Sequence, residues 1–409
     1  MSKYAFFGRS VFPFHLLAMA AVGALILGGA SAMAAPQDDD AGSVDENVQV
    51  GKGFSAPEPP VAVLEMAQHR KSRKTLMSGY FTQYKREAAP GLIRITANGA
   101  QDPLFNVGDG LDGPATAIVP LRDGGAYIGG AFQTYDGQQF GNLIRIGRDG
   151  ALDTDYQPAG FNDDISAMTL LPDGSLVVAG FFTLFGSQPV AGGLARLNPD
   201  GTLDSTFESP DGTPRGTIES LLTVGKNRVL VGGIFEDYGT TRVNGIARIR
   251  TDGTLDESFK TGRGFSPVSG TLGVYQFTKF RKGYLVGGAF SKYRSQKTGN
   301  LVLISKEGRP SKKFRAKSGF DGQVNSIAIQ ANNRVIAVGN FSNYRNKSAP
   351  GIVRLREDGL LDNSFQAGKG FNASVSESLL RSDGSLLVGG FFNRYDGQLS
   401  PALVGIQTK

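Results

Sequence analysis

The chain has 409 residues, with 43 Lys or Arg against 37 Asp or Glu, 57 Gly, and neither Cys nor Trp. Without Cys there can be no disulfides, so packing alone must hold the fold. The balance of 40% hydrophobic and 20% charged residues is that of a globular protein, and the many glycines favour a turn-rich all-β fold over a disordered chain.

The N-terminal segment has the layout of a cleavable secretory signal. Lys3 and Arg9 precede an apolar stretch over residues 11–27, and small residues with Ala-x-Ala spacing follow it. An uncleaved membrane anchor is the alternative, because the apolar run is nearly long enough to span a bilayer. We expect residues 1–35 to be a signal peptide and 36–42 a linker, and the protein to be exported to the periplasm, the cell surface or the exterior.

Downstream, a Gly-x-Phe motif recurs seven times at intervals of 50 to 55 residues. An aromatic residue follows each motif Phe by three positions. A fixed period of this length is typical of repeat architectures. The motif residues are Gly79/Phe81, Gly130/Phe132, Gly180/Phe182, Gly233/Phe235, Gly288/Phe290, Gly339/Phe341 and Gly390/Phe392.

Each repeat unit predicts four short strands joined by tight turns. In the third unit these are residues 165–171, 175–182, 193–197 and 202–207. Asp-Gly pairs separate the first strand from the second and the third from the fourth, and Gly tolerates the positive φ that such turns need. Short strands at this spacing, with almost no helical periodicity, indicate the blades of a β-propeller.

The two ends of the chain predict how the ring closes. A motif of the type Thr-Leu-Asp-x-x-Phe ends units one to six, with Ser311 in place of the Asp in unit five, whereas the seventh unit stops without a copy. The missing copy lies at residues 43–48. We therefore predict a seven-bladed β-propeller over residues 43–409, with four-stranded blades and an N-terminal strand that completes the last blade and leaves no open edge.

Some motif residues are predicted to be structural. Gly lets a neighbouring backbone or ring approach closely, and the Phe that follows is expected to fill the gap between adjacent blades. The clearest examples are Gly130, Phe132, Gly233, Phe235, Gly288, Phe290, Gly390 and Phe392.

Taken together, the elements Asp-Gly-Thr-Leu-Asp-x-x-Phe, Pro-Asp-Gly and Val-Gly-Gly-x-Phe-x-x-Tyr resemble the bacterial delta-60 repeat propellers. The resemblance covers residues 43–409. It implies an exported or surface-associated bacterial propeller and supplies no catalytic residues. A weaker similarity to kelch blades rests on the Gly-Gly pair and the downstream Tyr, but the kelch Trp is missing.

Little in the sequence points to catalysis or a cofactor. His69 is the only His beyond the signal, and the chain has no Cys. The residues that a catalytic triad or a zinc site requires are therefore almost absent, and no catalytic or metal residues are assigned. A calcium site is left as an alternative, because oxygen ligands occur at close spacing in Asn198, Asp200 and Asp204, and again in Asp252 and Asp256. The alternative is that these carboxylates hydrogen-bond turn amides.

Ligand-binding candidates lie in loops two–three and in the connections between blades. Lys52, Arg263 and Lys369 sit in Gly-x-Gly-Phe elements, and Tyr135, Tyr238 and Tyr395 follow the motif Phe. The alternative for the tyrosines is that they pack between blades.

Positive charge concentrates between residues 279 and 317, where 12 Lys or Arg accompany one acid, Glu307. Such a cluster attracts anionic partners, or is simply a solvated face. The basic patch predicted from it comprises Lys279, Arg281, Lys282, Lys312, Lys313, Arg315 and Lys317.

From these features we expect a non-enzymatic binding or scaffold propeller of the bacterial envelope that contacts a protein or an anionic polysaccharide. Export argues against nucleic acid as the partner, and we expect a monomer with no membrane span once the signal is removed. The alternative is a carbohydrate-active or lactone-type hydrolase that uses carboxylates, with or without calcium, at the central channel.

Overall fold

The computed structural model describes residues 41–69, 71–209, 216–268, 270, 272–316 and 319–409, all of which belong to one compact unit, Asp39–Lys409. The expected signal peptide and most of the expected linker lie outside the described residues. Within the described ranges, no helix is long and apolar enough to cross a membrane.

The described residues form 37 strands and one short 3-10 helix, η1 (Ala191–Gly193), so the predicted all-β class is confirmed. Most strands belong to antiparallel three-stranded meanders, in which the second strand pairs with both the first and the third. We number these meanders sheets 1 to 7 in chain order.

The first strands of sheets 1 to 7 are β2 (Ala62–Gln68), β7 (Ala115–Pro120), β12 (Ile165–Leu170), β17 (Thr217–Val224), β23 (Gly273–Phe280), β28 (Gln323–Ile329) and β33 (Val375–Leu380). The second strands are β3 (Thr75–Tyr80), β8 (Ala126–Gly130), β13 (Leu176–Gly180), β18 (Arg228–Ile234), β24 (Gly283–Ala289), β29 (Val335–Asn340) and β34 (Leu386–Gly390). The third strands are β6 (Leu92–Ile95), β11 (Leu143–Ile146), β16 (Leu194–Leu197), β21 (Ile246–Arg250), β27 (Leu301–Ser305), β32 (Ile352–Leu355) and β37 (Leu403–Ile406).

A small hairpin of two-residue strands connects the second strand of each sheet to the third. In sheets 1 and 5 a further short strand, β1 (Phe54–Ser55) or β22 (Phe265–Ser266), pairs with it. The hairpins are β4/β5 (Gln83–Tyr84, Glu87–Ala88), β9/β10 (Thr134–Tyr135, Gln138–Gln139), β14/β15 (Leu184–Phe185, Gln188–Pro189), β19/β20 (Asp237–Tyr238, Thr241–Arg242), β25/β26 (Lys292–Tyr293, Gln296–Lys297), β30/β31 (Asn343–Tyr344, Lys347–Ser348) and β35/β36 (Arg394–Tyr395, Gln398–Leu399).

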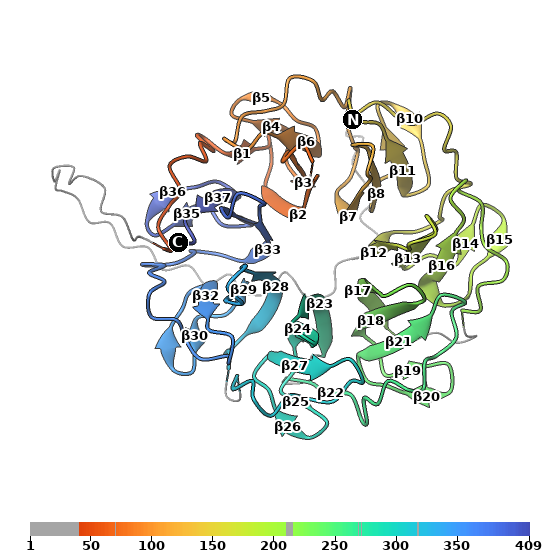
Figure 1. Cartoon of the computed structure of the whole chain (residues 1–409). Helices are drawn as coiled ribbons and strands as arrows, with labels where there is room; N and C mark the ends of the chain where they lie inside the picture. The colour runs from red at the N-terminus through yellow and green to blue at the C-terminus, as the bar shows by residue number, and fades with distance from the viewer. Residues whose placement is uncertain (1–40, 70, 210–215, 269, 271, 317–318) are drawn as a thin grey trace. The chain divides into compact units, whose positions relative to one another are not determined.

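The first strands surround a common centre (Figure 1). Each contacts the first strand of the next sheet, and β33 of sheet 7 contacts β2 of sheet 1, so the order is cyclic. Each first strand also carries a one-residue register shift near its start, such as that between Val63 and Glu65 in β2. A bulge of this kind re-aims side chains, here toward the centre.

The fourth segment of each unit pairs with the third strand through one bridge only, for example Leu355 with Leu361 in sheet 6. In the seventh sheet the bridge joins Ile406 to Val44, from the other end of the chain. The described sheets are therefore three-stranded ladders with one extra bridge, where the sequence predicted a full fourth strand.

Hydrogen bonds fix the N-terminal segment against sheet 7. Asp45 N donates to Gly405 O at 2.8 Å, and Gln407 N donates to Ser43 O at 2.9 Å. Gly42 belongs to the same contact, because Tyr395 donates its hydroxyl hydrogen to Gly42 O. Residues 41 and 42, assigned to the linker from the sequence, are thus part of this contact.

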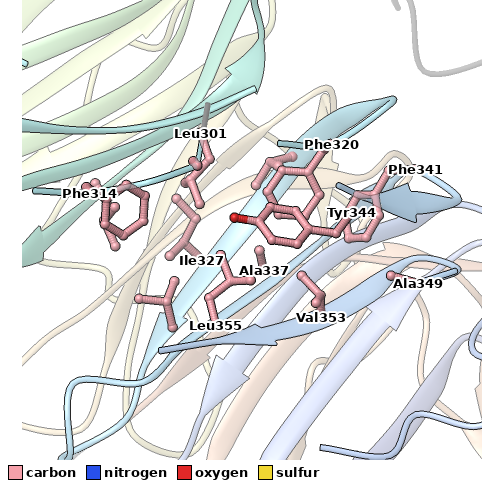
Figure 2. Close-up of a cluster of buried hydrophobic side chains, with 14 of the residues drawn as sticks. Leu301, Phe314, Phe320, Ile327, Ala337, Phe341, Tyr344, Ala349, Val353 and Leu355 are labelled. Atoms are coloured by element: carbon pink, nitrogen blue, oxygen red, sulfur yellow. The ribbon is translucent and has the colours of Figure 1, made fainter. Parts of the chain in front are cut away.

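The core between sheets contains closely packed aromatic rings. In sheet 7, Phe371 of the preceding connection packs against both the motif Phe and the Tyr three positions later: its ring centroid lies 4.5 Å from that of Phe392 and 4.7 Å from that of Tyr395, with the ring planes tilted. Phe132, Phe235, Phe290 and Phe392 are all at most 1% exposed. Figure 2 shows the cluster to which sheets 5 and 6 both contribute, with Leu301 and Phe314 facing residues of sheet 6.

The motif glycines are needed where strands cross closely. A Cβ on Gly390 would collide with the carbonyl oxygen of Ser374, and one on Gly130, Gly233 or Gly288 would meet a backbone carbonyl oxygen in the same way. Backbone atoms cannot yield as a flexible side chain could, so these positions require Gly.

An arginine–aspartate pair ties the third strand to the fourth segment in sheets 1, 2, 3, 4 and 6. In sheet 6, Arg354 is 1% exposed and its Nε lies 2.8 Å from Asp362 Oδ2, while its Nη1 donates to Thr408 O in the next sheet. Arg94, Arg196 and Arg248 reach a turn carbonyl of the following sheet in the same way. Sheet 5 has Leu303 and Ser311 at the two positions, so it lacks both the ion pair and the link.

Candidate functional site

The bulged first strands line a central cavity of about 540 Å³, to which all of sheets 1 to 7 contribute. Most positions that follow the bulge carry small or amide side chains, such as Ala117, Ala167 and Ser326. Sheets 1 and 7 instead carry Glu65 and Glu377.

Glu65 and Glu377 come from neighbouring strands and keep only part of their surface open to the cavity. Burial raises the pKa of both, and the nearby Glu377 carboxylate raises that of Glu65 further. The pKa of Glu377 is about 7, even though Ser326 donates to its Oε1 at 3.0 Å. Two close carboxyl groups disfavour double ionisation, so the pair holds a proton near neutral pH.

Glu219 and Tyr275 lie on the adjacent strands β17 and β23 of the same cavity wall. Burial raises the pKa of Glu219, although Thr217 Oγ1 donates to its Oε1 at 2.6 Å. Burial likewise raises the pKa of Tyr275 to about 12. These groups form an acidic, partly protonated lining suited to proton transfer or to a small polar ligand.

Sequence reasoning assigned none of these glutamates to the site. The available signal was the acidic residue at a position where the other repeats carry small or amide side chains. Recognising it as a pair required knowing that β2 and β33, at opposite ends of the chain, are neighbours.

The three tyrosines predicted as ligand candidates are buried. Tyr135, Tyr238 and Tyr395 are at most 3% exposed, and each donates its hydroxyl hydrogen to a turn carbonyl oxygen. This is the packing alternative that the sequence left open, and it leaves these rings no free surface for a ligand.

Lys52, Arg263 and Lys369 are exposed, each between two glycines with positive φ. They stand in the equivalent loops of sheets 1, 5 and 7, and none of them lines the central cavity. The Lys369 amide N donates to Asp396 Oδ1 at 2.8 Å, which anchors its loop to the hairpin β35/β36.

The basic residues of sheet 5 remain on the surface, and Lys317 lies outside the described residues. The turn after β23 and the turn after β27 lie at the same end of the sheet, because Gly283 pairs with both Phe280 and Ser305. We call the exposed residues of this region the basic surface: Lys279, Arg281, Lys282, Lys306, Arg309, Lys312, Lys313 and Arg315. One of them, Arg281, has an acidic partner, Glu357 at 3.4 Å.

The carboxylates considered for calcium are occupied by protein groups. Asp200 Oδ1 accepts hydrogen bonds from Thr202 N and Oγ1, and Asp252 Oδ1 does the same with Thr254. Asp256 bonds to Ser258 and to two arginines. No three His, Cys, Asp or Glu side chains among the described residues are grouped to hold a metal ion.

Six segments of the chain match a family model described as "Domain of unknown function (DUF5122) beta-propeller": residues 73–105, 122–156, 171–207, 227–259, 330–365 and 381–404. None of them covers sheet 5, the sheet that lacks the arginine–aspartate pair. No curated protein sequence matches the chain.

Solved propellers share the fold at low identity. The WD40 β-propeller domain of Doa1 is 12% identical, with a TM-score of 0.53, over 86% of this chain and 95% of that one. The extracellular domain of the hybrid two-component system BT4673 from B. thetaiotaomicron is 15% identical, with a TM-score of 0.52; the match covers 86% of this chain and 39% of that one. The chain is thus an all-β protein with a propeller fold.

Proposed function

We propose that this chain is an exported, non-enzymatic binding propeller of the bacterial envelope that contacts an anionic polysaccharide through its basic surface. The observation that carries the proposal is the charge of sheet 5, where eight exposed cations gather around two turns and a neighbouring segment. Export is supported by the N-terminal sequence and is compatible with extracellular domains of sensor proteins among the structural neighbours.

We further propose that sheets 1 to 7 act as seven blades of a rigid ring, each completed by its fourth segment, with the segment around Val44 completing the last. The cyclic contacts of the first strands and the bridge from Val44 to Ile406 support this arrangement. The resemblance to delta-60 repeats remains our interpretation of the motifs. A rigid ring fixes the positions of its surface charges, which reduces the ordering cost of binding a long polymer.

The proposal is tested by titrating the purified full chain with fluorescently labelled polygalacturonate. We expect affinity to fall by about tenfold or more between 50 and 200 mM salt, because exposed charges are screened over shorter distances as salt rises. The double variant Lys279→Glu/Lys282→Glu should weaken binding strongly. Lys226→Glu, on the corresponding exposed turn of sheet 4, is the matched control.

Retained binding in the double variant, or salt-insensitive binding, would refute the role of the basic surface. Binding of an acidic protein but of no glycan would redirect the proposal to a protein partner. We expect an equimolar complex with short chains, in keeping with a monomer.

The acidic cavity favours a second candidate, a hydrolase that acts on a carbohydrate or a lactone. Glu377, with a pKa of about 7, could serve as a general acid near neutral pH, with Glu65 as the second carboxyl group. Turnover of a glycoside or lactone by the full chain, lost in Glu377→Gln, would support it. Absence of turnover across such substrates would leave the binding role alone.

A further inference from the structure

A second cavity lies on the outer edge of sheet 5. Its volume is about 630 Å³, within the range of roughly 300–1,000 Å³ that small-molecule sites occupy. The hairpin strand β26 and the segment that follows β27 form its walls, and the β30/β31 turn of sheet 6 reaches its rim. Leu301 and Phe314, drawn side by side in Figure 2, belong to its apolar lining.

Three exposed cations surround this groove: Lys297, Lys312 and Arg345. No Asp or Glu lines it, and no ion pair joins any of the three to a carboxylate of the described chain. Unlike Arg281 on the basic surface, these cations therefore keep their charge uncompensated. A groove of this charge favours an anion.

A buried hydroxyl group in the groove is also without a partner. Thr298 is 4% exposed, and its Oγ1 makes no hydrogen bond to any described residue. Its amide is satisfied, because Thr298 N donates to Ser291 O as the matching amides of the other hairpins do. Buried hydroxyls normally have partners. Thr75, Tyr156 and Ser209 carry the other unpaired hydroxyls of the described residues, but of the four only Thr298 lines one of the two cavities, which points to a ligand.

Comparison with the other sheets shows that the unpaired hydroxyl is local. A hydroxyl stands at this position only in sheets 5 and 7, and that of Ser400 is not among the unpaired groups of the described residues. The position of Thr298 is held elsewhere by Ala89, Phe140, Val190, Val243, Ala349 and Ser400.

Phe314 also differs from most of its equivalents. In sheets 1, 2, 4 and 6 the corresponding aromatic ring is covered by the arginine of the ion pair; the Arg354 guanidinium carbon, for example, lies 5.1 Å from the Phe365 centroid. In sheet 5, Leu303 replaces that arginine, and Phe314 contacts Phe280 edge-on. The groove thus combines an aromatic wall, a hydroxyl and three cations.

We propose that this groove binds one carboxylated sugar unit. Its carboxylate would lie among Lys297, Lys312 and Arg345, and the apolar ring face would rest on Phe314. A ring hydroxyl would exchange a hydrogen bond with Thr298 Oγ1, which is covered in this structure and would turn into the groove by rotation of the side chain. This inference rests on the proposed function, because it places a single unit of the anionic polysaccharide beside the basic surface.

The test is calorimetric titration of the full chain with galacturonate, tri-galacturonate, glucose and inorganic sulfate. We expect both uronates to bind, glucose not to bind, and sulfate to bind at least about tenfold more weakly than galacturonate, because it cannot use the apolar wall. Binding of the trimer alone would mean that the site reads a chain and not a free sugar acid. Equal binding of sulfate and galacturonate would overturn the proposal.

Thr298→Val separates a ligand role from a structural one. Replacing an unpaired buried hydroxyl by a methyl group should leave thermal stability unchanged or higher, while galacturonate affinity falls about tenfold. Lys297→Ala should weaken binding similarly, and Lys347→Ala, an exposed lysine on strand β31 of the next hairpin that does not line the groove, is the control. Unchanged affinity in Thr298→Val and Lys297→Ala would refute the site.

The variants also distinguish this inference from the proposed function. Lys279→Glu/Lys282→Glu lies outside the groove and should reduce polymer binding without changing galacturonate binding. If galacturonate binds but the polymer does not respond to the double variant, the groove stands and the basic surface fails. If the polymer responds to the double variant but galacturonate does not bind, the reverse holds.

Discussion

The buried ion pair of sheet 6 allows a quantitative test of how the third strand and the fourth segment are held together. In Asp362→Ser, the Arg354 guanidinium would lose the carboxylate that lies 2.8 Å from its Nε while remaining 1% exposed. Leaving such a charge unpaired costs about 3–5 kcal/mol. Total stabilities of roughly 5–15 kcal/mol make this a large loss, so we expect the midpoint of urea unfolding to fall sharply.

Sheet 5 shows which residues can replace the ion pair, because it carries Leu303 and Ser311 at the positions of Arg354 and Asp362. The double variant Arg354→Leu/Asp362→Ser removes the buried charge together with its partner. We therefore expect the double variant to be about 1–3 kcal/mol more stable than Asp362→Ser. Arg354→Leu completes the double-mutant cycle, which gives the coupling energy between the two side chains.

The cycle is measured by urea unfolding followed by far-UV circular dichroism, because the chain has no Trp. The pair Arg356–Asp358, separated by 3.8 Å with the arginine 55% exposed, is the control and should contribute less than about 1 kcal/mol. If Asp362→Ser costs no more than Asp358→Ser, or if the double variant is as unstable as the single one, the reasoning about the buried charge is wrong.

The same pair predicts an acid response. Burial alone would raise the pKa of Asp362, but hydrogen bonds from Ser364 and the charges of Arg354 and Arg334 hold it below its ordinary value of 3.8. A carboxyl group with a depressed pKa stabilises the fold above its ordinary pKa, and this contribution is lost as pH falls through the lower, folded value. The stability difference between the wild type and the double variant should therefore shrink below about pH 4.

Three further predictions concern single side chains. Tyr344→Phe removes a buried hydrogen bond to a turn carbonyl and should lower the free energy of unfolding, measured in urea, by about 1–2 kcal/mol. An unchanged free energy would show that this hydrogen bond does not stabilise the fold. Because burial raises the pKa of Glu377 to about 7, the wild-type melting temperature should fall between pH 5 and pH 8, and Glu377→Gln should reduce that fall. Glu65, Glu219 and Asp164, whose pKa values burial also raises, should account for the remainder; an unchanged slope would contradict the assignment. Gly390→Ala places a Cβ against a backbone carbonyl and should abolish soluble folded protein, as judged by circular dichroism after expression; a stable variant would refute the need for Gly there.

The repeat pattern predicted the all-β propeller class well because each unit repeats the same local constraints. Gly390 and Phe392 illustrate this: one permits close backbone contact and the other fills the space that results. The fourth strand was overestimated, because its motif Asp turns the chain after one bridge. In sheet 6, Asp362 Oδ1 accepts hydrogen bonds from Ser364 N and Oγ and so starts a turn where the motif suggested a strand.

The candidate sites were harder to foresee because they depend on neighbours far apart in the chain. Glu65 and Glu377 face one cavity only because the first strands of sheets 1 and 7 are adjacent. Thr298 looks like an ordinary loop residue until its burial is known. By contrast, the concentration of lysine and arginine in sheet 5 is visible directly, although Tyr135 shows that a recurring loop aromatic need not be available to a ligand.

The arginines that reach from one sheet to the next have a mechanical consequence for the ring. Arg354 joins sheet 6 to sheet 7 through its hydrogen bond to Thr408 O. Leu303 cannot form such a bond between sheets 5 and 6. The junction of sheets 5 and 6 is instead joined by the exposed pair Arg281–Glu357 and by the Arg315 amide, which donates to Asp358 O, so we expect it to open more readily than the junction of sheets 6 and 7. Amide hydrogen exchange around Phe314, beside the groove, would then be faster than around Phe365. A bound sugar acid would slow that exchange by holding sheets 5 and 6 together.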